Sequence, residues 1–182
     1  MPIEFTKMQA TGNDFIIIDE LERAIVANKA EFAKLACDRH FGIGADGVLF
    51  ISKASSGVYG MKIINPDGSE AEMCGNGMRC VALYLKKYHA PTARKFRVKT
   101  LAGIIEPELE PNGLIRVKMG KPSFKCRDLP MECKNEMFIN QEFKVGLPDE
   151  SIVKSARLPC PSGMGELPTA DFTRIFRMSL YC

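Results

Sequence analysis

The sequence predicts an α/β protein of the α+β type, in which a mixed and mostly antiparallel sheet wraps around one central helix. Short alternating or apolar segments separated by turn residues are typical of strands, and one longer segment is apolar on almost every face of a helix. The segments show no βαβαβ alternation, which argues against a doubly wound parallel sheet. With 46% hydrophobic residues in 182, the chain can bury one core and carry a small appendage.

The strand-like segments are bounded by residues that favour turns. Gly12-Asn13-Asp14 is expected to form a tight turn between the first two strands, and the segment 65–69 (NPDGS) is a second strong turn signal. The second strand is the more continuously apolar of the first pair and should be the more deeply buried. In chain order, the expected strands are IEFTKMQ, FIIIDE, VLFIS, YGMKIIN, KFRVKTL, GIIEPELE, GLIRVKMG and EMFINQEFKV.

Two helices are expected. The segment 30–39 has apolar residues at helical spacing and should end near Phe41-Gly42. The segment MRCVALYLKKYH is apolar at its first eight positions except Arg79. An amphipathic surface helix would have a polar face, so this second segment predicts a helix that is buried on most sides.

The regular pattern ends at Val145. Residues 146–182 are rich in Pro, Ser and Gly and show no sustained hydrophobic period. We therefore expect one folded domain over residues 1–145, followed by an irregular tail over 146–182 that is not a folded domain.

Composition excludes several classes of protein. No run of about eighteen apolar residues is present, and the opening MPIEFTKMQA has an acid where a secretion signal has its apolar stretch, so we expect a cytoplasmic protein without a membrane span. The net charge is only +3. The densest basic stretch, residues 86–99, has few interleaved aromatic residues, so nucleic-acid binding is not expected.

The cysteines indicate reduced thiols. Their number, seven, is odd and no CxxC pair occurs, so neither a disulfide framework nor a zinc site is expected. They stand at positions 37, 74, 80, 126, 133, 160 and 182.

One glycine-rich segment matches a cofactor motif only by letter. Residues 42–47 read GIGADG and satisfy GxGxxG, but a dinucleotide fingerprint follows a strand and opens a helix. Here a helical segment precedes and a strand follows, so we interpret the glycines as a helix-to-strand turn. The later GNG lacks the Lys-Ser/Thr that would hold nucleotide phosphates. No nucleotide cofactor is expected.

The informative cysteine is Cys74, which stands immediately before Gly75-Asn76-Gly77 and the buried helix. Unpaired N–H groups and the positive end of the dipole at a helix N-terminus stabilise a thiolate and bind a carboxylate. One loop could thus bind the α-carboxylate of an amino acid and present a base beside its α-carbon. A small buried packing cysteine is the alternative interpretation of the same pattern.

Other polar candidates depend on the fold. Asn13 and Asn65 each stand at a strand end, where asparagine is also simply a good turn former. They matter for function only if they converge on Cys74. Cys37 and Cys80 lie on apolar helix faces and are expected to pack in the core. The two histidines stand at helix ends, where a capping or surface role is expected.

Several blocks of the sequence resemble diaminopimelate epimerase in the same order and at similar spacing. They are KMQATGNDFIIID, FGIGADGVLF, NPDGSEAEMCGNGMRC and TLAGIIEPELEPNGLIRVKMGKPSF, and the resemblance spans about residues 3–145. It implies a fold of two pseudo-symmetric α/β domains, each a sheet around a central helix, with the active site in the cleft between them. This chain would supply one of the two.

The resemblance implies roles for five residues. Cys74 matches one of two catalytic cysteines, and Gly75 and Asn76 match groups that bind the substrate. Asn13 and Asn65 match side chains that hydrogen-bond to it. At position 47 the chain has glycine where some relatives have a glutamine that contacts the substrate, and glycine has no side chain to make that contact.

The implied activity is a cofactor-independent isomerase reaction that interconverts LL- and meso-diaminopimelate for lysine and peptidoglycan precursors. One cysteine removes the α-proton and the other delivers a proton to the opposite face, without a cofactor or metal. The partner implied is a small amino-acid substrate.

The second cysteine motif is not found. After Val145 the resemblance predicts a segment like GNPH, a Glu-Arg pair and a motif like ACGTGACA, and residues 146–182 contain none of them. Our hypothesis is a frameshift or truncation near residue 146, which would leave this chain inactive alone.

Two alternatives stay open. The first is a related racemase or isomerase of the same fold, similar to proline racemase or to a phenazine-pathway enzyme. The second is a non-catalytic domain that binds amino acids or forms a homo-oligomer through the apolar face on which the second domain would dock.

Overall fold

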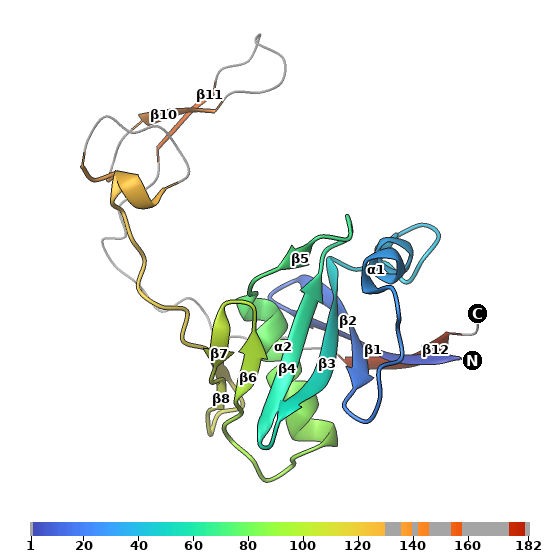
Figure 1. Cartoon of the computed structure of the whole chain (residues 1–182). Coiled ribbons are helices and arrows are strands. Elements are labelled where there is room, and N and C mark those ends of the chain that lie inside the picture. The colour runs from blue at the N-terminus through green and yellow to red at the C-terminus, as the bar shows by residue number, and fades with distance from the viewer. Residues whose placement is uncertain (1, 130–135, 140–141, 146–153, 158–174, 181–182) are drawn as a thin grey trace. The chain divides into compact units, whose positions relative to one another are not determined.

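The structure is a computed structural model that describes residues 2–129, 136–139, 142–145, 154–157 and 175–180 (Figure 1). The chain forms two compact units, one of residues 1–119 with 170–182 and one of residues 120–169. The described helices include none that is long and apolar enough to cross a membrane.

The first unit is built on an eight-stranded sheet with the order β12-β1-β2-β3-β4-β6-β7, and β5 pairs with β4 beside this path. The β2–β3 and β4–β6 pairs are parallel and the others are antiparallel, which confirms the predicted mixed, mostly antiparallel sheet. Its strands are β1 (Ile3–Ala10), β2 (Asn13–Glu20), β3 (Gly47–Ser55), β4 (Val58–Ile64), β5 (Glu70–Ala71), β6 (Val98–Thr100), β7 (Gly103–Ile105) and β12 (Ile175–Leu180).

The central strands are buried on both faces because a helix packs on each side of the sheet. Successive side chains of a strand point to opposite faces, so an unbroken apolar run can serve two cores. The core shared with α1 (Lys29–Cys37) contains Ile16, Ile18, Val48 and Phe50. The core shared with α2 (Gly75–Tyr88) contains Phe15, Ile17, Leu49 and Ile51.

Helix α2 is the predicted buried helix. It packs against β1, β2 and β3 and also against β9 (Ile115–Arg116), so it is covered on more than one side. Figure 1 shows it lying across the sheet on the face away from α1. Its fully buried side chains include Met78, Val81 and Leu85. His89 caps its C-terminus through a bond from its N–H to the Leu85 carbonyl, as expected for a histidine at a helix end.

Some predicted strands are shorter or divided in the structure. The segment GIIEPELE forms β7 and β8 (Glu108–Leu109), with a break at Pro107, which has no N–H to donate to a ladder. Strand β9 forms only part of GLIRVKMG and pairs with β8. The short strand β5 was not predicted, because two residues are too few to show a period.

The second unit contains the 3-10 helix η1 (Cys126–Asp128) and a pair of antiparallel strands, β10 (Glu142–Val145) and β11 (Lys154–Arg157). The strand predicted over EMFINQEFKV therefore forms at its end, and residues 136–139 are not in a strand. Cys133, Cys160, Cys182 and most of the tail lie outside the described residues. The domain boundary at residue 145 and the irregular tail stay predictions.

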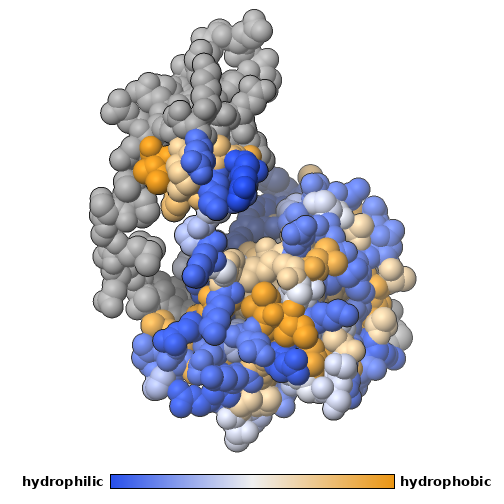
Figure 2. Space-filling model, turned by 60° about the vertical axis from the view of Figure 1, so that its left-hand side comes forward, coloured by the Kyte–Doolittle hydropathy of each residue, from blue (hydrophilic) through white to orange (hydrophobic). Residues whose placement is uncertain are grey.

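Several large apolar side chains of the first unit are exposed. Figure 2 shows apolar residues gathering on one face of the protein. Phe41 is 97% exposed, and large apolar side chains also stand out near β6 and β7. The exposed members in this unit are Ile25, Leu35, Phe41, Leu101, Ile104 and Met119.

Glu20 is a buried carboxylate with a full set of partners. Its side chain accepts bonds from the N–H groups of Ile25 and Val26, each at 2.9 Å, and pairs with Lys29 at 2.7 Å. Burial alone opposes ionisation, but these bonds outweigh it and hold the pKa of Glu20 below its usual value of 4.5. The carboxylate thereby joins the end of β2 to the loop before α1.

The Glu20→Gln variant should lower the free energy of unfolding by about 1 to 3 kcal/mol at pH 7, because the bonds to a buried charge are lost. Since the folded pKa is depressed, this stabilisation is present above pH 4.5 and is lost as the pH falls through the lower folded value. Urea unfolding at pH 7 and pH 3 measures it. If the difference in unfolding free energy between variant and wild type is the same at both pH values, Glu20 does not stabilise the fold as an ionised carboxylate.

Candidate active site

Three polar residues that are far apart in the sequence lie at one end of the sheet. Asn13 begins β2, Asp46 immediately precedes β3, and Asn65 immediately follows β4. The pairing register sets the start of β2 beside the start of β3, and the end of β4 beside that same start. This end of the sheet is therefore a place where polar side chains can converge.

Cys74 lies at the N-terminus of α2 at this end. It is the N-cap residue, with extended backbone angles of φ −139° and ψ 119°, and its Sγ accepts a bond from the N–H of Gly77 at 3.4 Å. The predicted glycine turn into a helix is thus confirmed. The side chain is partly exposed, whereas Cys80 on the same helix is fully buried. The packing interpretation therefore fits Cys80 better than Cys74.

Glycine at position 77 allows the close approach of the helix start to the sheet. A Cβ on Gly77 would lie 3.2 Å from Cδ2 of Leu49, and one on Gly75 would lie 3.2 Å from Sδ of Met119. Gly77 thus lets the first turn of α2 settle against β3, and Gly75 leaves room for Met119.

The structure brings Asn13, Cys74 and Asn76 together. Sγ of Cys74 lies 3.7 Å from Oδ1 of Asn13, and Nδ2 of Asn76 donates to the same oxygen at 3.4 Å. Oδ1 of Asn76 in turn accepts a bond from Arg79 at 2.8 Å and one from the Thr11 hydroxyl at 3.1 Å. Three of the five predicted site residues therefore share direct contacts.

The other two predicted site residues, Gly75 and Asn65, make different contacts. Gly75 is the first residue of α2 and contributes a backbone N–H to its first turn. Asn65 lies in the turn after β4, where its side chain donates to Ser69 at 3.0 Å and its N–H donates to the Ser69 carbonyl. Within the described part of the chain, no hydrogen bond joins Asn65 to Cys74.

Charged residues complete the site, and sequence reasoning missed them. Nδ2 of Asn13 donates to Asp46 at 2.7 Å, and Arg39 bridges Asp46 and Asp14, with 2.8 Å to each carboxylate. Lys7 pairs with Asp14 at 3.1 Å. Burial opposes ionisation of Asp14, but the bonds from Arg39 and Lys7 outweigh it and hold its pKa below the usual 3.8. The sequence did offer a signal for two of them, because Asp14 and Asp46 each stand at the start of a buried strand.

The GxGxxG segment is a turn, as predicted. Helix α1 precedes it and β3 follows it. Gly44 has a φ of +75°, and a Cβ on Gly42 would lie 2.2 Å from the Leu35 carbonyl oxygen. The glycines therefore allow the chain to reverse tightly after α1 and to place Asp46 at the sheet end.

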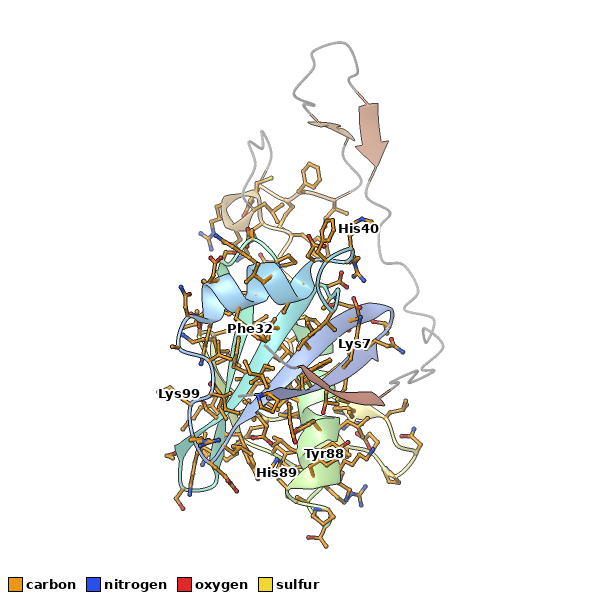
Figure 3. All side chains as sticks on the ribbon, turned by 90° about the vertical axis from the view of Figure 1, so that its right-hand side faces the viewer. Lys7, Phe32, His40, Tyr88, His89 and Lys99 are labelled. Atoms are coloured by element: carbon orange, nitrogen blue, oxygen red, sulfur yellow. The ribbon has the colours of Figure 1, made fainter. Side chains whose placement is uncertain are left out.

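A separate cavity of about 760 Å³ lies at the other end of β2 and α2. Its lining includes Asp19, Tyr84 and His89, and Asp19 accepts bonds from Tyr84 at 3.0 Å and from His89 at 2.6 Å. Figure 3 shows His89 at one end of α2. His89 is the C-cap residue of this helix, whereas Cys74 is its N-cap residue. This cavity is therefore no part of the site around Cys74.

Thiol reactivity should distinguish Cys74 from Cys37. Burial raises the pKa of Cys37 to about 11, and the nearby charges of Asp14 and Asp46 add to this. At pH 8 only on the order of one in a thousand such thiols is ionised. Iodoacetamide should therefore alkylate Cys74 at least about tenfold faster than Cys37, as measured by mass spectrometry of the peptides. Equal labelling in the folded chain would contradict this placement.

The fold has counterparts among solved structures. A phenazine biosynthesis PhzC/PhzF protein from Clostridium difficile has a TM-score of 0.51 and 19% identity, over 62% of this chain and 42% of that one. A probable proline racemase from Agrobacterium radiobacter has a TM-score of 0.50 and 14% identity, over 63% and 41%. These likenesses place the chain in the class of proteins with the racemase and epimerase fold.

Sequence comparison identifies the family. The family model for diaminopimelate epimerase matches residues 5–125. The diaminopimelate epimerase of Carboxydothermus hydrogenoformans is 46% identical over 74% of this chain and 50% of that protein, and the one of Methanocella arvoryzae is 48% identical over 76% and 51%. The chain belongs to the diaminopimelate epimerase family, which confirms the resemblance noted in its motifs. It spans about half the length of the curated relatives it matches.

Proposed function

We propose that this chain contributes one catalytic cysteine, Cys74, to a cofactor-independent epimerase that interconverts LL- and meso-diaminopimelate. The observation that carries the proposal is a partly exposed thiol at the N-terminus of α2, beside Asn13 and Asn76. We further propose that the enzyme acts in the cytoplasm, in the synthesis of lysine and peptidoglycan precursors, without a cofactor.

The first turn of α2 supports binding of the amino acid's α-carboxylate. The N–H groups of Gly75 and Asn76 lie in the first turn, where no carbonyl of the same helix can accept from them. The helix dipole adds positive potential at this point. A carboxylate held there would bring the attached α-carbon close to the sulfur of Cys74.

The reaction requires a base and an acid on opposite faces of one carbon. Cys74 would take the α-proton onto Sγ as the C–H bond breaks, and the electron pair would be stabilised by the bound carboxylate. A second acid would deliver a proton to the other face and form the new C–H bond with inverted configuration. A single base would return the proton to the face from which it came.

The second cysteine is expected in the part of the family's length that this chain does not span. Of the other cysteines that the structure describes, Cys37, Cys80 and Cys126 are buried. We propose that residues 1–182 alone do not invert the substrate, because inversion needs the second acid. Inversion of LL-diaminopimelate by this chain alone would refute this.

The test uses the full chain with LL-diaminopimelate in heavy water. Proton NMR follows the loss of the α-proton signal, and a chiral separation follows the appearance of the meso form. Exchange without inversion is the expected result for one cysteine acting alone. Exchange of the α-proton of proline but not of diaminopimelate would favour the related racemase, and the absence of exchange with both would refute the catalytic role.

Exposed apolar residues favour a second candidate, a non-catalytic domain that binds amino acids or self-associates. Met119 lies against Gly75 beside the candidate site, and Met119, Leu101 and Phe41 are all exposed. Light scattering across a range of concentrations would detect a homo-oligomer. Binding of diaminopimelate without any α-proton exchange would support this candidate over the enzyme.

A further inference from the structure

A continuous chain of hydrogen bonds runs through the site from one arginine to another. Arg79 donates to Oδ1 of Asn76 at 2.8 Å, and Nδ2 of Asn76 donates to Oδ1 of Asn13 at 3.4 Å. Nδ2 of Asn13 then donates to Oδ2 of Asp46 at 2.7 Å, and Arg39 donates to the other oxygen of Asp46 at 2.8 Å. Cys74 lies beside this chain, at Oδ1 of Asn13.

The groups at the two ends of this series of hydrogen bonds determine the direction of every bond within it. A guanidinium can only donate and a carboxylate can only accept, whereas an asparagine amide can do either, depending on how it is turned. Arg79 therefore fixes the oxygen of Asn76 toward itself, and Asp46 fixes the nitrogen of Asn13 toward itself. Both constraints are met at once only when the Asn13 carbonyl oxygen faces Cys74 and Asn76.

We propose that Asp46 is a positioning residue that turns the Asn13 carbonyl oxygen toward Cys74, where it accepts a hydrogen bond from the thiol of the substrate-free protein. Because Asp46 binds the Asn13 nitrogen, Cys74 is offered an acceptor at 3.7 Å, to which a protonated thiol can donate. A thiolate at this place would instead face the lone pairs of the Asn13 oxygen. The role of the thiol proton in catalysis rests on the proposed function, whereas the hydrogen bond from the thiol to Asn13 does not.

The same arrangement specifies what Asn13 offers a ligand. Its oxygen is an acceptor and its nitrogen is already bound to Asp46. This suits the ammonium group of an amino acid, while its carboxylate goes to the N–H groups of Gly75 and Asn76 at the helix start. An arriving ammonium group would compete with the thiol for the Asn13 oxygen and so favour release of the thiol proton.

The test is Asp46→Asn, with alkylation of Cys74 as the measurement. The new amide has only one oxygen, whereas Asp46 uses one oxygen for Arg39 and the other for both the Asn13 nitrogen and the Asp14 N–H. The Asn13 nitrogen thus loses its charged acceptor, and Asn13 is free to rotate and to present its nitrogen to Cys74. The Cys74 thiol then loses the Asn13 oxygen as its acceptor, and the thiolate form gains the Asn13 nitrogen as a donor. Alkylation of Cys74 at pH 7 should become about tenfold faster, with the whole pH profile displaced to lower pH.

Two controls separate this rotation from the loss of a negative charge. Asp14→Asn removes a charge from the same cluster, but the Asp14 side chain binds Arg39 and Lys7 rather than the Asn13 amide, so its effect should stay below about threefold. In an Asn13→Ala background, Asp46→Asn should lose its larger effect, because no amide remains to rotate. Equal effects of Asp46→Asn and Asp14→Asn, or an effect independent of Asn13, would overturn the proposal.

Amide NMR of the unsubstituted chain keeps the proposal open to refutation if Asp46→Asn does not fold. The Asn13 side-chain nitrogen and the Asp14 N–H donate to the same oxygen of Asp46, at 2.7 and 3.1 Å. Their protons should show a strong nuclear Overhauser contact, and a contact from the Asn13 amide protons to the Cys74 β-protons instead would refute it. Alkylation needs no turnover, so a failure here leaves the proposed function untouched.

Discussion

Replacing Cys74 with alanine is expected to reduce exchange of the diaminopimelate α-proton with solvent by about 10² to 10⁴-fold. The sulfur is the only group that the described site places at the N-terminus of α2 with the chemistry of a base, since the amides beside it do not take up protons. Cys74→Ser should lose nearly as much, because a serine hydroxyl is far less acidic than a thiol and is hardly ionised at neutral pH.

The matched control for this variant is Cys80→Ala, which removes a buried thiol from the same helix. It should exchange the α-proton at the wild-type rate as long as it remains folded, because its side chain lies in the core. Circular dichroism checks that both variants fold. Exchange that survives Cys74→Ala would eliminate this residue as the base, and exchange lost equally in both variants would point to a general loss of structure.

The Leu85→Ala variant should lower the free energy of unfolding by about 2 to 5 kcal/mol. Leu85 is fully buried in the core between α2 and the sheet, so its truncation removes apolar contacts and leaves a cavity that rigid neighbours cannot fill. Its carbonyl also accepts the capping N–H of His89, and the truncation leaves that backbone bond unchanged. The loss thus measures packing alone.

The control for this variant is Lys87→Ala on the exposed face of the same helix. It should change stability by no more than about 0.5 kcal/mol, since it removes little buried surface. Urea unfolding followed by circular dichroism measures both variants at pH 7. A loss of less than about 1 kcal/mol in Leu85→Ala would show that α2 is not the packing centre that we describe.

Patterns within short segments of the sequence were sufficient to predict the main strands, the buried helix α2 and the place where this helix begins. Alternating and continuous apolar runs indicated β1 to β4, and the all-round apolar segment indicated α2, because both signals arise from side-chain direction along a single element. The order of helix, turn and strand around residues 42–47 was enough to reject a dinucleotide site. Pro107 shortened a predicted strand, because a missing N–H outweighs apolar character.

The partners of each polar side chain could not be inferred in this way. Asn13 and Asn65 look alike in sequence, since both are turn asparagines at strand ends, yet only Asn13 contacts Cys74 while Asn65 bonds within its own turn. Asp46 stood in a segment that we had rejected as a cofactor motif, and the structure placed it against Asn13. Neither outcome follows from the residues near each asparagine.

The amino-acid sequence alone was enough to establish the family, because several motifs occur in the right order along it. It also established the buried helix and the place of Cys74 at its start, because these depend on neighbours within a few residues. The proximity of Asn13, Asp46 and Cys74 came from the folded chain, through the parallel register of β2 with β3 and the packing of α2 across them. Strand register is a long-range property, set by the whole core, and so the polar chain that orients the thiol became visible only in three dimensions.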